Sequence, residues 1–165
     1  MTPRFVHLHV HSEYSLADSV VRIPELLAAA RAAGMPAVAL TDQGNLFAMV
    51  TFYKAALAAG VKPIVGADVW LRLADDGKPP ARVVLLCRNR AGYANLARLV
   101  SRSYMEGQES GLPVVHAAWL EEGGADGLAG QLVGKGQGLL DHPIYLGGVG
   151  PDAGVGAQKF IHRQV

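Results

Sequence analysis

The sequence predicts an α/β fold built on a parallel sheet or barrel. Short apolar runs typical of buried strands alternate with longer segments whose apolar residues recur at helical spacing. This alternation is the pattern of βαβ units, in which a helix connects neighbouring parallel strands. Histidines and aspartates stand on or directly after several of the apolar runs. They therefore occupy the strand ends where such folds collect their chemistry.

The first predicted strand runs from Phe5 to Ser15 and carries three of the six histidines. Strict alternation sends the valines and the leucine to one face and the imidazoles to the other, about 7 Å apart along the strand. The three imidazoles are those of His7, His9 and His11. Because neutral imidazole is the commonest metal ligand, this face indicates a metal or phosphate site. The alternative is one satisfied core histidine with the other two at a solvated strand end.

Two helices and a strand are expected next. The first helix opens at Pro24, a residue favoured in the first helical turn, and ends before Gly34, which suits the position just past a helix. A short strand covers residues 37–41. The second helix is expected from Asn45, as its N-cap, to Ala59.

Two further strands are expected over residues 64–71 and 82–88. The second contains Cys87, the single cysteine, within an apolar run, where a small buried hydrophobe is favoured over a nucleophile. Asn89 is the predicted N-cap of a third helix.

Four side chains on these strands are candidate metal ligands. His9 and His11 lie on the first predicted strand, Asp42 closes the second and Asp68 lies late on the third. Carboxylate oxygens beside imidazole nitrogens suit zinc, manganese or iron. Any one of the aspartates taken alone is more typical of a turn or a helix cap.

Composition limits the binding partners and the cellular location that the chain can have. A net charge of +1 without a run of basic residues excludes the electrostatic footprint of an independent nucleic-acid binder. A single cysteine excludes an internal disulfide framework and fits a reducing cytoplasm. No apolar stretch approaches the length of a membrane span, and no signal peptide begins the chain. We therefore expect a cytoplasmic protein.

The last quarter of the chain differs in character. Twelve of the 20 glycines lie between residues 123 and 156, and apolar periodicity fades there. The segment 130–135 resembles a phosphate-binding loop but has three residues between its glycines instead of four. We expect residues 129–165 to form a glycine-rich, poorly structured tail.

Several motifs in the first 128 residues carry a resemblance to a known family. They are Phe5-Val-His-Leu-His-Val-His-Ser-Glu-Tyr-Ser15, Gly34-Met-Pro-Ala-Val-Ala-Leu-Thr-Asp42, Phe52-Tyr-Lys54, Gly60-Val-Lys-Pro-Ile-Val-Gly-Ala-Asp68, Asn89-Arg-Ala-Gly-Tyr-Ala-Asn-Leu96 and Trp119-Leu120. In order and spacing they resemble the N-terminal PHP domain of the bacterial DNA polymerase III alpha subunit. The resemblance implies a distorted, TIM-like β/α barrel, of which residues 1–128 would supply about the first half, a partial PHP domain.

The same resemblance assigns the metal ligands residue by residue. His9 and His11 match the family's His-x-His pair, while the segment 41–43 matches its Thr-Asp-His motif with glutamine in place of the histidine. Asp68 stands where the family has a glutamate, and Arg82 stands where it has a histidine. The resemblance therefore implies a degenerate site, vestigial or weak, with His9, His11, Asp42 and Asp68 as remaining ligands for zinc or manganese.

The function implied is that of a fragment of a replicative polymerase subunit. The polymerase carboxylates of the family lie far downstream, so this chain alone is not expected to polymerise DNA and would contact DNA only through the full-length enzyme. Its expected role is a scaffold and a docking surface for the proofreading exonuclease, among the other holoenzyme subunits. The alternative is a standalone metal-dependent PHP phosphoesterase using the same four residues. A half-barrel with unpaired sheet edges that does not fold stably is a third possibility.

Overall fold

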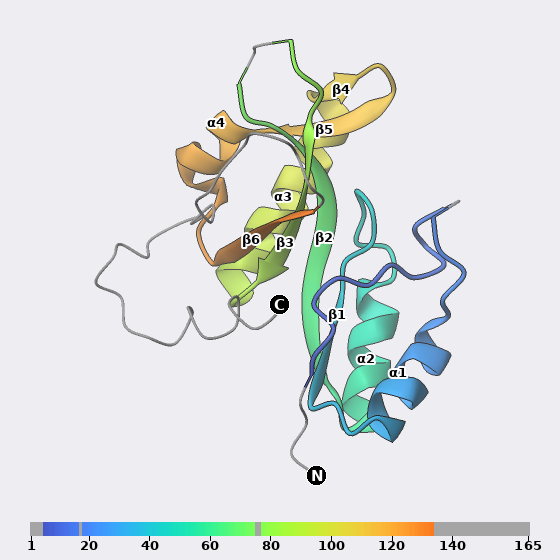
Figure 1. Ribbon diagram of the computed structural model, residues 1–165. Helices are drawn as coiled ribbons and strands as arrows, with labels where there is room; N and C mark the ends of the chain where they lie inside the picture. The colour runs from blue at the N-terminus through green and yellow to red at the C-terminus, as the bar shows by residue number, and fades with distance from the viewer. Residues whose placement is uncertain (1–4, 17, 75–76, 134–165) are drawn as a thin grey trace.

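The computed structural model describes residues 5–16, 18–74 and 77–133. It confirms the α/β fold class (Figure 1). The helices are α1 (Ile23–Ala32), α2 (Met49–Ala59), α3 (Arg90–Met105), the short α4 (Ala117–Trp119) and the π-helical turn η1 (Leu120–Gly124). The strands are β1 (Ala37–Leu40), β2 (Lys62–Arg72), β3 (Ala81–Cys87), β4 (Gln108–Glu109), β5 (Leu112–His116) and β6 (Leu128–Val133).

The sheet is mixed rather than parallel throughout. Its order is β4-β5-β2-β3-β6, and β1 pairs with β2 beside this path. β2 is parallel to β1 and to β5, but β3 is antiparallel to both β2 and β6. Only residues 73–80 separate β2 from β3. A crossover to a parallel strand needs a dozen or more residues, so this connection forces an antiparallel pair.

β2 is the central strand of the fold. Residues 62–65 pair with β1, residues 66–71 pair with β3, and residues 70–72 pair with β5. One apolar cluster packs where β2 and β3 meet α3, and a second where β1 meets α1 and α2. Figure 1 shows α1 and α2 side by side on one flank of the long β2 strand, with α3 behind β3.

The ends of α1 and α3 confirm the sequence prediction. Pro24 lies in the first turn of α1, and Gly34 follows its end at a φ of 67°. The Asn89 side chain accepts a hydrogen bond from the Gly92 N–H at 2.9 Å and so caps α3.

The prediction for the start of α2 is wrong by three residues, because the N-cap is Ala48 and not Asn45. The helix begins at Met49, and Asn45 instead anchors the turn before it. The Asn45 amide donates to the carbonyls of Tyr14 and Gln43 at 3.1 and 3.0 Å and accepts from the Phe47 N–H at 3.1 Å. An asparagine that bonds its own neighbours in this way favours a turn over a helix start.

The first predicted strand is also not a regular strand. Residues 5–12 are extended beside β1, with the His7 and Val10 carbonyls accepting from Ala39 and Thr41 at 2.8 Å. The Val10 N–H, however, donates to the Thr41 hydroxyl at 2.9 Å instead of to the backbone. This side-chain bond interrupts the ladder. Exposure alternates as predicted only over residues 5–10, because His11 and Ser12 are both turned inward.

The C-terminal part of the described chain joins the sheet. The prediction of a poorly structured tail is wrong for residues 129–133, because β6 (Leu128–Val133) pairs with β3 and these residues form the edge of the sheet. The remainder of the predicted glycine-rich tail, residues 134–165, lies outside the described residues. Within the described ranges, none of the helices has the length and hydropathy that crossing a bilayer requires.

Candidate metal centre

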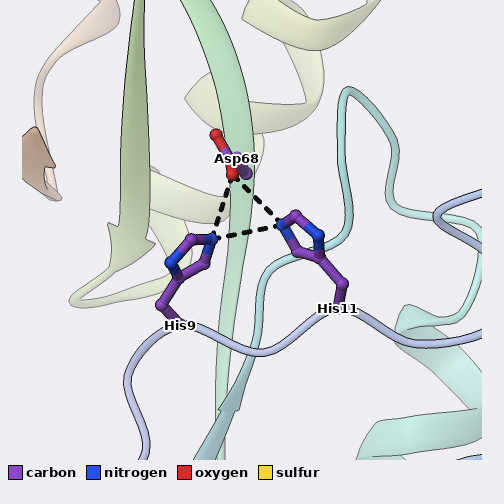
Figure 2. A group of neighbouring side chains, drawn as sticks. All are labelled: His9, His11 and Asp68. Atoms are coloured by element: carbon purple, nitrogen blue, oxygen red, sulfur yellow. Dashed lines mark hydrogen bonds and ion pairs between the residues drawn. The ribbon is translucent and has the colours of Figure 1, made fainter. Parts of the chain in front are cut away.

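His9, His11 and Asp68 converge at one point between the N-terminal segment and β2 (Figure 2). The Nε2 atoms of His9 and His11 lie 3.0 and 3.1 Å from the same carboxylate oxygen, Oδ2 of Asp68. The two Nε2 atoms are 3.2 Å apart. The Asp68 side chain is only 1% exposed, whereas that of His9 is 38% exposed. The group therefore joins a buried carboxylate to two imidazoles nearer the surface.

The alternation of β2 aims Asp68 at the histidines. Its neighbours Ala67 and Val69 face the apolar cluster under α3, so Asp68 points to the opposite face of the sheet. Its backbone is held as well, because its N–H donates to the Asp42 carbonyl at 3.1 Å and its carbonyl accepts from Gly44 at 2.8 Å. The segment that follows β1 thereby fixes the position of the carboxylate.

Arg82 contacts the oxygen that the histidines share. It lies on β3, directly opposite Trp70 of β2. Its Nη2 donates to Asp68 Oδ2, and its Nε lies 3.4 Å from Oδ1. The centre of its guanidinium group is 5.5 Å from the centroid of the Trp70 ring. The arginine is thus held by a carboxylate at one side and an aromatic face at another.

Asp18 completes the cluster and was missed by the sequence analysis. Its Oδ2 lies 2.6 Å from His11 Nδ1 and 3.9 Å from Arg82 Nη2. A carboxylate on the far nitrogen of a ligating histidine is common at metal sites because it orients the ring. The available signal in the sequence was an acidic residue seven positions after His11.

Asp42, the fourth predicted ligand, is not brought into this group. Its carboxylate is buried and accepts hydrogen bonds from the Ser12 N–H at 2.6 Å, from the Ser12 hydroxyl at 2.8 and 3.0 Å, and from the Ser15 hydroxyl at 2.7 Å. His7 is exposed and packs edge-on against the Phe5 ring, with the ring centroids 4.5 Å apart. Both residues therefore make contacts of their own, separate from the three converging side chains.

A family model described as the PHP domain matches residues 7–162. The chain belongs to the PHP domain family. The resemblance stated from the motifs is thereby confirmed, and the comparison with curated relatives agrees with it.

Several relatives of this PHP domain are DNA polymerase III alpha subunits. The chain is 46% identical over 147 residues to the alpha subunit of Pseudomonas aeruginosa, a match that covers 89% of this chain and 12% of that protein. It is 45% identical over 159 residues to that of Xylella fastidiosa strain Temecula1, covering 82% of this chain and 13% of the relative. For Escherichia coli K12 the identity is 43% over 120 residues, covering 73% and 10%. The chain thus spans about a tenth of the length of these relatives.

Two solved structures resemble part of the chain. One is an amidohydrolase from Chromobacterium violaceum, 23% identical with a TM-score of 0.48. The other is a candidate metal-dependent phosphoesterase from Bifidobacterium adolescentis, 14% identical with a TM-score of 0.47. Each match covers 61% of this chain and 33% of the other.

The donor set of this PHP domain suits one metal ion at most. His9, His11 and Asp68 offer two imidazole nitrogens and one carboxylate oxygen within 4.8 Å of one another, a combination that zinc and manganese accept. A cation at this point would meet Arg82 on the same carboxylate oxygen. With the guanidinium in place, the described residues do not fit a bound divalent ion.

Proposed function

We propose that this chain is the N-terminal PHP segment of a DNA polymerase III alpha subunit and acts there as a structural scaffold. The identity of 46% to the Pseudomonas aeruginosa alpha subunit over 147 residues carries this proposal. DNA synthesis would belong to the much longer whole subunit, which would also make the contacts with DNA. The setting would be the bacterial cytoplasm.

The contacts at the cluster favour a scaffold over a hydrolase. Asp68 has its charge balanced by Arg82, and Asp42 is engaged by two serines. These interactions join the N-terminal segment, the segment after β1, β2 and β3. In this proposal the cluster of His9, His11 and Asp68 does not catalyse a reaction but holds these four segments together.

The proposed partner of the scaffold is the proofreading exonuclease subunit, alongside the other holoenzyme subunits. A stripe of exposed apolar side chains on and just before α2 offers a docking surface, which we call the α2 stripe. Its members recur at helical spacing and are 75%, 54%, 45% and 59% exposed in the order Phe47, Val50, Tyr53 and Leu57. Contiguous exposed apolar residues, unlike scattered ones, mark interaction sites.

Binding between purified exonuclease subunit and this chain tests the proposal. Sedimentation or calorimetry should detect a complex, and Val50→Glu combined with Leu57→Glu should weaken it by about tenfold or more, since a charge would enter an apolar contact. Val20→Glu is the matched control, because Val20 is 90% exposed and lies outside the α2 stripe. Absence of a complex, or equal weakening by the control, contradicts the docking role.

A metal-dependent phosphoesterase is the second candidate function, favoured by the convergence of His9, His11 and Asp68. Hydrolysis of p-nitrophenyl phosphate by the purified chain with zinc or manganese, abolished by His9→Ala, would establish it. The scaffold proposal expects no turnover above that of the His9→Ala variant.

A further inference from the structure

We propose that Arg82 is the resident cation of this site. Its guanidinium takes the place of a divalent metal, balances the buried Asp68 carboxylate and keeps metal out. Removing the guanidinium should convert His9, His11 and Asp68 into a zinc site. This inference rests on the geometry of the cluster and does not depend on the replicative role proposed above.

Asp68 carries a buried charge that must be balanced. A carboxylate that is 1% exposed needs an opposite charge or several hydrogen bonds, because burial of an unpaired charge is very costly. The imidazoles of His9 and His11 carry a charge only when they are protonated. Arg82 is the permanently charged group in contact with it, since arginine stays protonated in proteins. The cation that this carboxylate requires is therefore supplied by the chain itself.

Arg82 is held in place by the neighbouring side chains. Its position on β3 is opposite Trp70, so the guanidinium reaches diagonally across to Asp68, two residues back along β2. The Trp70 ring lies 5.5 Å away, and the Asp18 carboxylate lies 3.9 Å from Nη2. The arginine side chain is 27% exposed, so most of its surface is already covered by these neighbours.

The three candidate ligand atoms are already spaced for a metal. Their separations are 3.0, 3.1 and 3.2 Å. Atoms bound to one tetrahedral zinc at about 2.0–2.1 Å lie about 3.3 Å apart. The three atoms therefore stand close to the edges of a metal-binding tetrahedron. A zinc ion bound there would share Asp68 Oδ2 with the Arg82 guanidinium, and the repulsion between the two cations opposes binding.

Zinc binding by variants of the full chain tests this proposal. Arg82→Met removes the charge and keeps an unbranched side chain against Trp70, and should bind about one zinc per chain, at least tenfold tighter than the unaltered protein. Zinc binding is measured in three ways: by the zinc content after gel filtration, by cobalt absorption spectra, and by the thermal midpoint with and without zinc. Arg88→Met is the matched control, because Arg88 is exposed and lies six residues further along the chain. It should bind no more zinc than the unaltered chain.

A double variant tests whether His9 is a zinc ligand. The zinc gained by Arg82→Met should be lost in the double variant His9→Ala, Arg82→Met. If Arg82→Met is unfolded without metal, recovery of its circular dichroism on adding zinc supports the proposal, and failure to recover contradicts it. Arg82→Lys keeps a charge and should remain folded without zinc. Stoichiometric zinc in the unaltered chain or in Arg82→Lys, or a folded Arg82→Met that gains none, overturns the proposal.

Discussion

Asp42 should contribute more to stability than to metal binding. Asp42→Ala removes the acceptor for the Ser12 N–H at 2.6 Å and for two serine hydroxyls at 2.7–2.8 Å. A hydrogen bond to a charged group contributes about 1.5–3 kcal/mol, and a buried donor left unpaired costs about 1–3 kcal/mol. The hydroxyls can rotate to other acceptors, but the Ser12 N–H cannot. We therefore expect the free energy of unfolding to fall by about 3–5 kcal/mol.

Urea unfolding followed by circular dichroism, in buffer containing EDTA, measures this loss. Ser101→Ala on the exposed face of α3 is the control and should change the free energy of unfolding by less than about 0.5 kcal/mol. A loss of less than about 1 kcal/mol for Asp42→Ala without metal would contradict the structural role of Asp42. A loss that appears only when zinc is present would also contradict it, because Asp42 would then act as a ligand.

Three further outcomes are expected. Asn89→Ala should lower the free energy of unfolding by about 1 kcal/mol in a urea titration, because α3 loses its cap. Asn89→Asp should largely preserve the free energy of unfolding, since aspartate caps a helix as well as asparagine does. Gly92→Ala should cost about 2 kcal/mol or more, because its new Cβ would overlap the Gly127 carbonyl oxygen. Gly34→Ala, which meets no atom within 4 Å, should lose only about 1 kcal/mol through backbone strain at its φ of 67°. Burial raises the pKa of the Cys87 thiol to about 11, from an ordinary value of 9.0. The folded state then holds its proton more tightly than the unfolded state, so the stability contributed by Cys87 is present below pH 9 and falls as the pH rises toward 11. Alkylation of the folded protein near neutral pH should be slow and should accelerate on unfolding, whereas equal rates in both states would contradict the burial.

The sequence predicted those features of the fold that depend on a few neighbouring residues. The Pro24 start of α1 and the Asn89 cap of α3 follow from backbone chemistry that depends on a few neighbouring residues. The antiparallel β3 and the interrupted N-terminal segment depend on distant partners. Periodicity showed that Val10 lies in an extended segment, but not that the Thr41 hydroxyl would take its N–H.

The site shows the same division. Identity and spacing predicted that His9, His11 and Asp68 would come together. They did not predict that Asp42 would bond Ser12 and Ser15, because a carboxylate after a strand can serve a turn or a metal equally well. The contact of Asp18 with His11 depends on how the chain between them folds back, which no sequence pattern revealed.

The long strand β2 makes the two apolar clusters one cooperative unit. Its first residues pair with β1 and the rest with β3, so neither half of the fold can open without exposing backbone groups of the other. At the junction, a Cβ on Gly66 would lie 2.5 Å from the Leu85 carbonyl oxygen, so β2 and β3 approach each other more closely there than a residue with a side chain would allow. Amide protons on both sides of this junction should therefore exchange with solvent only through global unfolding.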